Sequence, residues 1–582
     1  MDSLINRYIA RPFSIFFPKI IFIIIAVALC VSAILCFFYL INDHETIKNW
    51  YLGLNDCFYR HEYWTRDFFT SAVKLKGNKF ALAGIVFSIA GLVYSFLNIK
   101  RYWILKPALK DGTRAKYNSS WYVIIIIMAI GLWCWGNAHI DSSYDELFSA
   151  VNCADLPLFQ TMSYYMLVNN HILFNFLNNL LFSWYGDLLQ TSRFISLIAY
   201  AGILCCVFCW FSKMMRNKWH AFLAVIPVSL QFTTWAFASQ GRGYELQAFA
   251  TWLAFISIFN YVQKNGKTSL RANGFYCFVG FAIVPTFFYY YLSQLLFVLL
   301  FMVYNKRIDL KFIKYQLFCG VVVFLFYLPV ICYSGSGSFS GNYALSAMAK
   351  DIGSYIPMLF SNLKYDINFV SSFLLRENHP VNYMLFLFPL VLFFSKKKQN
   401  LLYGLYYTLF WLSFIAIAIY MKSHPAIRTI ILHFNFSLVI IIYTIYTCLE
   451  YVISKIAIIK KQDTFKTAAF TIIIALFSLH LYRRDADPEH ISDMYGYPIN
   501  YLYSVHSKVI DNIPAGNSIA FSNESFYYYY FCRKRHLNVS RCPKGNEDYY
   551  VIRPSENITG TITNRYSLVM SIEEDYELYK RK

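Results

Sequence analysis

The sequence predicts an all-α polytopic membrane protein with a small C-terminal α/β domain, and three observations predict this class. The 582-residue chain is 58% hydrophobic and only 14% charged, whereas soluble domains carry roughly 25% charged residues. About thirteen apolar segments are long enough to cross a bilayer as helices. Residues 483–582 then change in composition, with acidic residues, Pro and Gly between short apolar runs. These features exclude a typical soluble enzyme.

The membrane segments follow from length and composition. A helix needs roughly 20 apolar residues to cross the hydrocarbon core, because its backbone groups find no water there. His171 and several asparagines interrupt residues 161–183, so we expect that segment to be re-entrant or to lie on the surface. The region 274–304 is expected to hold two short spans around Tyr289. The other expected spans are residues 18–42, 80–98, 121–138, 194–212, 220–238, 245–262, 316–333, 383–395, 401–420, 430–452 and 468–482.

The positive charge predicts the orientation. Half of the 52 Lys and Arg residues lie in short loops on one side of the predicted spans, and that side is expected to be cytoplasmic. Residues 138–192 contain no Lys or Arg and therefore face outward. The loop 43–79 departs from this pattern, because it is expected outside yet holds six Lys and Arg. The net charge of +20 is accordingly a topology signal, and no nucleic-acid partner is expected.

Three parts of the chain are expected. Residues 1–119 form an N-terminal two-helix membrane addition, residues 120–482 a transmembrane module, and residues 483–582 an extracytoplasmic α/β domain with strands near 518–521 and 549–552. An odd number of spans places the N-terminus in the cytoplasm and the C-terminal domain outside. Usage rich in Lys, Ile, Asn and Tyr suggests a bacterial inner membrane with a periplasmic C-terminal domain. The aromatic run 526–531 is interpreted as a strand, with glycan or bilayer binding as alternatives.

Polar residues at the outward face carry the candidate chemistry. Asp145 and Glu146 follow the third span, where one carboxylate could act as a general base while the other orients a substrate or binds a cation. The alternative is a solvated acidic loop. Arg242 lies between two glycines, which would let the backbone approach an anion while the guanidinium binds that anion. His171 could donate to a phosphate or a hydroxyl, or be an interfacial histidine.

Together these motifs resemble the polytopic glycosyltransferases of the GT-C fold, and are most similar to the protein mannosyltransferase-like branch that includes the lipid A aminoarabinose transferases. The resemblance covers about residues 120–450. Two features depart from the family pattern: two additional spans, in residues 1–119, precede the span that leads to the acidic pair, and His171-Ile172-Leu173 stands where the family has His-Pro-Pro. The motifs are Asp145-Glu146, Asn170-His171 with Asn175, Gly186-Asp187, Ser192-Arg193, Arg242-Gly243-Tyr244, Pro285-Thr286 to Tyr291, and His424-Pro425-Ala426-Ile427-Arg428.

The resemblance implies an integral-membrane glycosyltransferase of the cell envelope that moves a hexosyl or pentosyl group from a polyprenyl-phosphate donor, with inversion, to an extracytoplasmic lipid, glycan or protein. It implies Asp145 as the base and Glu146 as its neighbour in donor or acceptor binding. Cations near the departing phosphate would stabilise its developing charge, and these are Arg242, Arg428, Lys422 and His424. Substrate contacts are expected from His171, Asn175, Tyr244, Tyr289, Tyr290 and Tyr291.

Two other functions stay open. A transporter or flippase of a lipid-linked or anionic solute would carry ionisable residues near midspan and two related halves, whereas the charges here cluster at outer helix ends. A membrane-anchored assembly or sensor protein would need no such cluster. Convergence of Asp145, Arg242 and Arg428 on one outward cavity would distinguish the enzyme. No cofactor and no metal ligand is assigned, and a divalent metal at the carboxylates stays open; membrane lipid is an expected partner.

Overall fold

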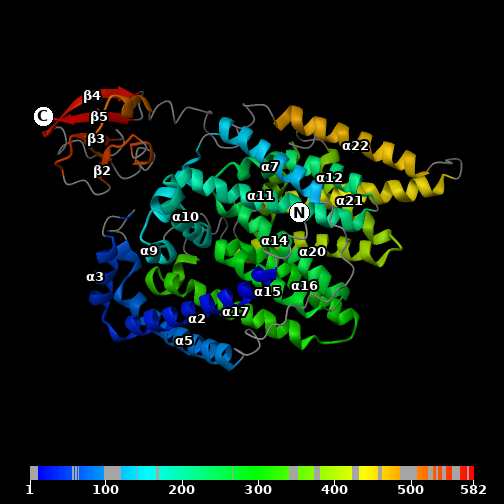
Figure 1. Ribbon diagram of the computed structural model, residues 1–582, viewed down its shortest axis with the longest axis horizontal. Helices are drawn as coiled ribbons and strands as arrows, with labels where there is room; N and C mark the ends of the chain where they lie inside the picture. The colour runs from blue at the N-terminus through cyan, green and yellow to red at the C-terminus, as the bar shows by residue number, and fades with distance from the viewer. Residues whose placement is uncertain are drawn as a thin grey trace.

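The computed structural model consists mainly of helices, with one small sheet at the C-terminal end (Figure 1). The fold class predicted from the sequence is therefore confirmed. The structure describes residues 11–55, 58, 62, 64–97, 119–140, 142–165, 170–215, 217–264, 266–339, 352–372, 380–422, 431–456, 462–485, 507–521, 529–532, 535–540, 545–552, 564–572 and 576–582.

Eight helices within the described residues are long and apolar enough to cross a membrane, which makes the chain a multi-pass integral membrane protein. The other predicted spans are helical but shorter, interrupted, or less apolar. The eight are Ser71–Leu97, Ser120–His139, Leu188–Met214, Pro285–Tyr304, Leu310–Tyr333, Lys398–Met421, Leu432–Lys455 and Gln462–Arg483.

Two N-terminal helices, α2 (Arg11–Ile41) and α5 (Ser71–Leu97), pack against each other, and α5 also packs on α17 (Leu310–Tyr333). Helix α3 (His44–Leu54) and a π-helical turn, Trp64–Phe68, lie between them in the chain. An aromatic cluster fills this junction and includes Tyr51 and Trp64, whose rings stack at 4.5 Å. The N-terminal pair is therefore joined to the rest of the protein through a buried core.

Several predicted segments are interrupted. Residues 161–183 divide into α9 (Leu158–Ser163) and α10 (Ile172–Tyr185), so the prediction that this segment is not one continuous span is confirmed. Residues 274–304 divide as predicted, because Val284 is extended before Pro285. The single span predicted at 220–238 is wrong: Gln231 adopts an extended backbone and separates α12 (Lys218–Leu230) from α13 (Phe232–Ala238).

The remaining helices form the body of the membrane module, whose largest core cluster joins α11, α14, α16, α20 and α21. Helix α18 had not been predicted as an element. The bounds are α7 (Ser119–His139), α8 (Tyr144–Ser149), η3 (Ala150–Ala154), α11 (Leu188–Met214), α14 (Gly243–Lys264), α15 (Lys267–Ile283), η4 (Pro285–Phe287), α16 (Phe288–Tyr304), η5 (Ser336–Phe339), α18 (Ile352–Ser372), α19 (Pro380–Leu387), η7 (Phe388–Phe394), α20 (Lys398–Met421), α21 (Ile431–Lys455) and α22 (Gln462–Asp485).

The C-terminal part contains a five-stranded sheet in the order β2-β1-β3-β5-β4. The first three strands pair in parallel, and β5 pairs antiparallel with both β3 and β4. The two strands predicted at 518–521 and 549–552 are confirmed as β1 and β3. The bounds are β1 (Ser518–Phe521), β2 (Asn538–Ser540), β3 (Tyr549–Ile552), β4 (Tyr566–Ile572) and β5 (Tyr576–Arg581).

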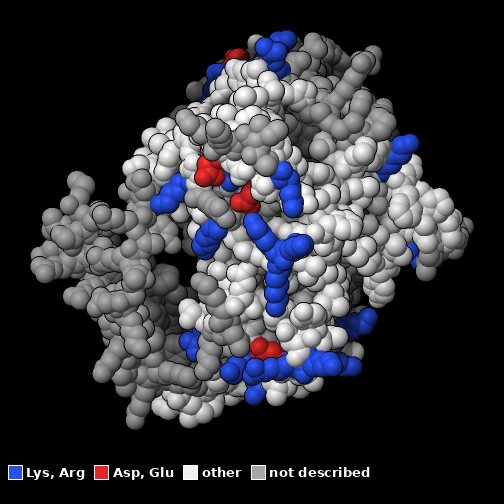
Figure 2. Space-filling view, turned by 90° about the vertical axis from the view of Figure 1, so that its right-hand side faces the viewer, with Lys and Arg blue, Asp and Glu red and all other residues white. Residues whose placement is uncertain are grey.

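One end of the membrane module is predominantly basic on its visible surface (Figure 2). The C-terminal sheet lies toward the end that carries α3, α9 and α10 (Figure 1). Figure 2 shows the opposite end, where Lys and Arg side chains clearly outnumber Asp and Glu on the visible surface. This is the distribution that the sequence predicts for a cytoplasmic face.

Candidate functional site

The acidic pair lies on the short helix α8, just after α7 ends. The hydroxyl of Ser143 caps α8 by accepting a hydrogen bond from the Glu146 backbone N–H at 3.2 Å. Asp145 and Glu146 occupy the first turn of α8, where the helix dipole favours negative charge. The π-helical turn η3 continues the chain into the buried residues 150–154. We call the end of the bundle that carries α8 the acidic edge.

Glu146 is enclosed in the protein. Its carboxylate accepts hydrogen bonds from Arg193 Nε at 2.8 Å and from Arg193 Nη2 at 3.0 Å. The backbone N–H of Gly241 donates to the same carboxylate at 2.6 Å. The side chain of Glu146 is 0% exposed and that of Arg193 is 4% exposed. Glu146 therefore joins α8 to α11 and to the loop between α13 and α14.

The two glycines beside Arg242 permit close contacts within the protein. A Cβ atom at Gly241 would lie 1.8 Å from Ser192 Oγ, and one at Gly243 would lie 2.6 Å from His171 Nδ1. The Gly243 backbone N–H donates to that His171 nitrogen at 2.9 Å. The sequence predicted glycines that bring the backbone to an anion, and the anion at Gly241 is the carboxylate of Glu146.

Arg242 lies buried behind Asp145. Its Nη1 donates to the Asp145 backbone carbonyl at 2.7 Å and to Ser149 Oγ at 2.8 Å, and its Nη2 lies 3.7 Å from Asp145 Oδ2. The guanidinium is 2% exposed, whereas the Asp145 side chain is 21% exposed. Burial lowers the pKa of Arg242, but Tyr244 and Asp145 raise it above its ordinary value, so the guanidinium stays charged. The acidic edge thus presents a reachable carboxylate with a buried cation behind it.

Three more predicted residues join this site. The ring of Tyr244 packs edge-on against His171, with centroids 4.7 Å apart, and the Arg242 guanidinium lies 5.4 Å from the centre of the same ring. Asn175 is one step further away: its amide donates to Asn170 Oδ1 at 2.8 Å. Asn170 in turn donates to two backbone carbonyls of the α9 region. The predicted residues from three outward segments therefore converge at one end of the bundle.

Other predicted residues are placed elsewhere or not described. Tyr289 packs against Phe414, and Tyr290 stacks on Phe410 in the main core. Lys422 ends α20 in a left-handed conformation, with φ of 48°. His424 and Arg428 lie outside the described residues. Asp145 and Arg242 accordingly lie side by side, whereas the expected convergence of Asp145, Arg242 and Arg428 on one outward cavity stays a prediction.

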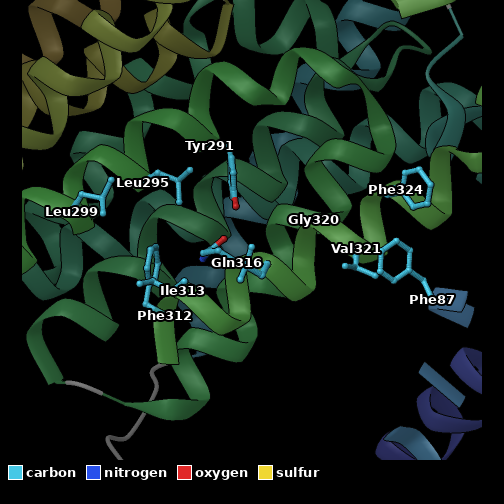
Figure 3. A pocket seen from close by; sticks show the side chains of 11 residues that line it. Phe87, Tyr291, Leu295, Leu299, Phe312, Ile313, Gln316, Gly320, Val321 and Phe324 are labelled. Carbon is cyan, nitrogen blue, oxygen red and sulfur yellow. The ribbon is translucent and has the colours of Figure 1, made fainter. Parts of the chain in front are cut away.

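Tyr291 lines an apolar cavity of about 530 Å³ between α16 and α17, with Phe87 of α5 at one side (Figure 3). Its walls are mainly Leu, Ile, Val and Phe side chains, several of them exposed on the lateral surface. Gln316 and Tyr291 are its polar lining residues (Figure 3). The shape and chemistry of this cavity suit a hydrocarbon chain.

Arg193 had not been assigned a role from the sequence, although its Ser-Arg motif was noted. A signal was present: Arg193 is the first cation after a stretch of the chain that lacks Lys and Arg, and it begins a predicted span. A buried arginine at such a position needs a carboxylate partner. Within the described residues, no group of three or more His, Cys, Asp or Glu side chains is arranged to hold a metal ion.

Comparison with known proteins gives structural matches alone: no family model and no curated protein matches the chain. The chain is similar to ArnT from Cupriavidus metallidurans bound to undecaprenyl phosphate, with a TM-score of 0.47 and 9% identity over 79% of this chain and 98% of ArnT. It is also similar to the archaeal oligosaccharyltransferase AglB from Archaeoglobus fulgidus, with a TM-score of 0.42 and 12% identity over 75% of this chain and 69% of AglB.

A third similar structure is the arabinosyltransferase EmbB from Mycobacterium smegmatis, with a TM-score of 0.39 and 11% identity over 84% of this chain and 49% of EmbB. AglB and EmbB are by name enzymes that transfer sugars, which is the kind of activity that the sequence resemblance implies.

Proposed function

We propose that this chain is an integral-membrane glycosyltransferase that transfers a sugar from a polyprenyl-phosphate donor to an acceptor hydroxyl at the acidic edge, with inversion. The observation that carries the proposal is the pairing of Asp145 with Arg242. A partly exposed carboxylate beside a buried, permanently charged guanidinium offers a proton acceptor and a phosphate-stabilising cation at one place. The acidic edge is then the periplasmic face of a bacterial inner membrane.

In the proposed reaction the acceptor oxygen forms a bond to the anomeric carbon, while the bond between that carbon and the phosphate oxygen breaks. Asp145 takes the proton of the acceptor hydroxyl. The polyprenyl phosphate leaves with the bonding electron pair, so negative charge grows on its oxygens. Arg242 stabilises that charge, and Arg428, Lys422 and His424 are proposed to assist it. Preorganised cations of this kind are worth most where charge develops.

The proposed contribution of Glu146 follows from its contacts. Because its carboxylate is enclosed by Arg193 and by the Gly241 backbone N–H, we assign it to holding Arg242 against Asp145. His171 and Tyr244 form the adjoining wall, to which the sugar or the acceptor would bind, with Asn175 supporting His171 through Asn170. Among the three predicted tyrosines, Tyr291 lines the apolar cavity, which supports assigning it to the lipid chain of the donor.

A lipid-linked donor explains why the site lies at the end of a helical bundle. The sugar phosphate would lie at the acidic edge, while the isoprenoid chain stays among apolar helices. The cavity between α16 and α17 is the proposed place for part of that chain, since its lining is apolar and several of its side chains are exposed laterally. The acceptor is a periplasmic lipid, glycan or protein.

The test is sugar transfer in membranes supplied with polyprenyl-phosphate sugars extracted from the host. Asp145→Asn is expected to lower turnover by about 10²- to 10⁴-fold, the usual contribution of a general base. The control is Asp43→Asn, the same chemical change at the N-cap of α3, where asparagine caps as well as aspartate. Normal turnover by Asp145→Asn would exclude Asp145 as the base.

A second measurement concerns the donor. Arg242→Ala is expected to cost about 10²- to 10³-fold in rate, and unchanged donor use would contradict a phosphate contact. Mass spectrometry of envelope glycolipids and glycoproteins from a strain that lacks the chain identifies the product. A strain with unaltered glycans but altered lipid distribution between the two leaflets would favour a flippase instead.

A further inference from the structure

Among the described residues of the C-terminal domain, a helical turn at 529–532, which we call the aromatic turn, contacts the membrane module. The sequence predicted a strand for this run, and for the described residues that prediction is wrong. Tyr530 is 9% exposed and packs in a cluster with Leu147, Phe148 and Leu189. The first two of these directly follow Glu146 on α8. The aromatic turn therefore covers the apolar side of the helix that carries Asp145.

Two phenolic hydroxyl groups attach the aromatic turn to the module. Tyr530 Oη donates to Asp187 Oδ1 at 3.2 Å and is 3.3 Å from Oδ2, and Tyr529 Oη donates to Asp155 Oδ2 at 3.2 Å. Burial, together with the negative charge of Asp187, raises the pKa of Tyr530. The Tyr530 hydroxyl consequently stays protonated at neutral pH and remains a donor. Charge-assisted hydrogen bonds of this kind are stronger than neutral ones.

Asp187 links the aromatic turn to the ion pair at the site. Its Oδ1 caps α11 by accepting hydrogen bonds from the backbone N–H groups of Leu189 and Gln190 at 2.9 and 3.0 Å. Arg193, less than two turns further along α11, pairs with Glu146. The same helix end thus binds the C-terminal domain through Asp187 and the acidic helix through Arg193.

We propose that Tyr530 is a positioning residue for the transfer reaction: the aromatic turn, when docked, holds α8 so that Asp145 lies beside Arg242. Helix α8 has six residues, and a helix this short is not stable in isolation. It is fixed by Arg193 and Gly241 on its polar side and by Tyr530 on its apolar side. The C-terminal domain is therefore a part of the catalytic unit, an inference that rests on the proposed function.

The experiment uses the full chain in lipid nanodiscs and two independent measurements. Hydrogen exchange detected by mass spectrometry reports the stability of residues 144–154, and steady-state transfer gives kcat and the KM for the donor. The variants are Tyr530→Ala and Tyr530→Phe. The control is Tyr579→Phe, which removes a hydroxyl group whose hydrogen bond, to Glu577, lies within the C-terminal domain. Exchange in β3 reports whether the domain stays folded.

We expect Tyr530→Ala to speed exchange of residues 144–154 at least tenfold and to lower kcat about tenfold, with the donor KM within twofold of wild type, since small misplacements of reacting groups lower rates strongly. Tyr530→Phe keeps the ring and loses one hydrogen bond, so a fall of about threefold is expected. Exchange in β3 should be unchanged in all variants.

Three results would overturn the inference. One is wild-type exchange of residues 144–154 in Tyr530→Ala. Another is a fall in kcat for Tyr579→Phe equal to that for Tyr530→Phe. The third is a raised donor KM at constant kcat, which would make Tyr530 a binding contact. Absence of transfer by the wild-type chain with any donor contradicts the proposed function instead, and the exchange measurement still decides whether the aromatic turn holds α8.

Discussion

Substitution of Gly241 by alanine is expected to push the loop between α13 and α14 away from α11 at the acidic edge. Gly241 is not among the residues with a left-handed backbone, so alanine fits its dihedral angles and the cost is steric. The new Cβ would lie 1.8 Å from Ser192 Oγ and 2.6 Å from Ser192 Cβ, whereas ordinary contacts begin near 3.4 Å. The Ser192 hydroxyl can rotate away, but its Cβ atom cannot, so either the loop or α11 must move by about 0.8 Å to restore an ordinary distance.

The magnitude follows from what that displacement breaks. The Gly241 N–H donates to the Glu146 carboxylate at 2.6 Å, and losing a hydrogen bond to a charged group costs about 1.5–3 kcal/mol. Overpacking of a tight core adds about 1–3 kcal/mol. Arg242 is the next residue and would move relative to Asp145, and a misplacement of about 1 Å can cost about 100-fold in rate.

A second substitution tests whether the contact with Ser192 causes these losses. Ser192→Gly removes both clashing atoms, and its own cost is about 1 kcal/mol for a glycine within a helix. The double variant is therefore expected to be more stable and more active than Gly241→Ala alone. If the two substitutions acted independently, their costs would add and the double variant would be the less stable one. Gly131→Ala is the control, since a Cβ atom there meets nothing within 4 Å.

The assays are thermal unfolding of the purified full chain at a fixed scan rate, because large proteins often unfold irreversibly, and sugar transfer in membranes. If adding Ser192→Gly failed to raise the stability and activity of Gly241→Ala, the close approach of Gly241 to Ser192 would not be the cause of the losses. Equal stability of Gly241→Ala and Gly131→Ala would refute the displacement altogether.

Three further outcomes are expected. Arg193→Lys should lower the free energy of unfolding by about 2 kcal/mol, because an ammonium cannot donate the two parallel hydrogen bonds that the guanidinium donates to Glu146. Thermal unfolding measures the loss, and an unchanged midpoint would contradict this prediction. Gln160→Leu removes the amide that bonds the buried backbone carbonyl of Tyr51 and the partly buried one of Asn55, so its midpoint should also fall, by an amount corresponding to roughly 1–3 kcal/mol for the buried carbonyl. Asp548 accepts hydrogen bonds from the backbone N–H and the hydroxyl of Ser518, which lower its pKa. The contribution of the ionised Asp548 to domain stability is present above its unfolded pKa of roughly 3.9 and is lost as the pH falls through the lower folded pKa. Asp548→Asn should therefore speed hydrogen exchange in β1 at pH 7 and match wild type at the lowest pH. A difference from wild type that stays constant at all pH values would show that the Asp548 carboxylate is not the cause.

Much of the fold could be predicted because hydropathy is a local property. Residues 161–183 could be predicted as broken from their asparagines, and residues 274–304 as two short spans, although the break lies at Val284 and Pro285 and Tyr289 lies inside α16. Strands β1 and β3 of the C-terminal domain were visible as short apolar runs, whereas β2, β4 and β5 had not been predicted. The break at Gln231 was not visible, because an apolar run stays apolar where a helix ends and another begins.

The sequence by itself determined which residues could carry chemistry, since the carboxylates and cations of the outward segments stand out against an apolar chain. Tertiary structure decided how they pair: Arg193 pairs with Glu146 and Arg242 with Asp145, which are 47 and 97 residues apart in the sequence. It also decided that Tyr290 and Tyr291 point into the core and into a cavity, because successive residues on a helix point about 100° apart. Pair energies depend on distance and burial, and neither is set until distant helices pack together.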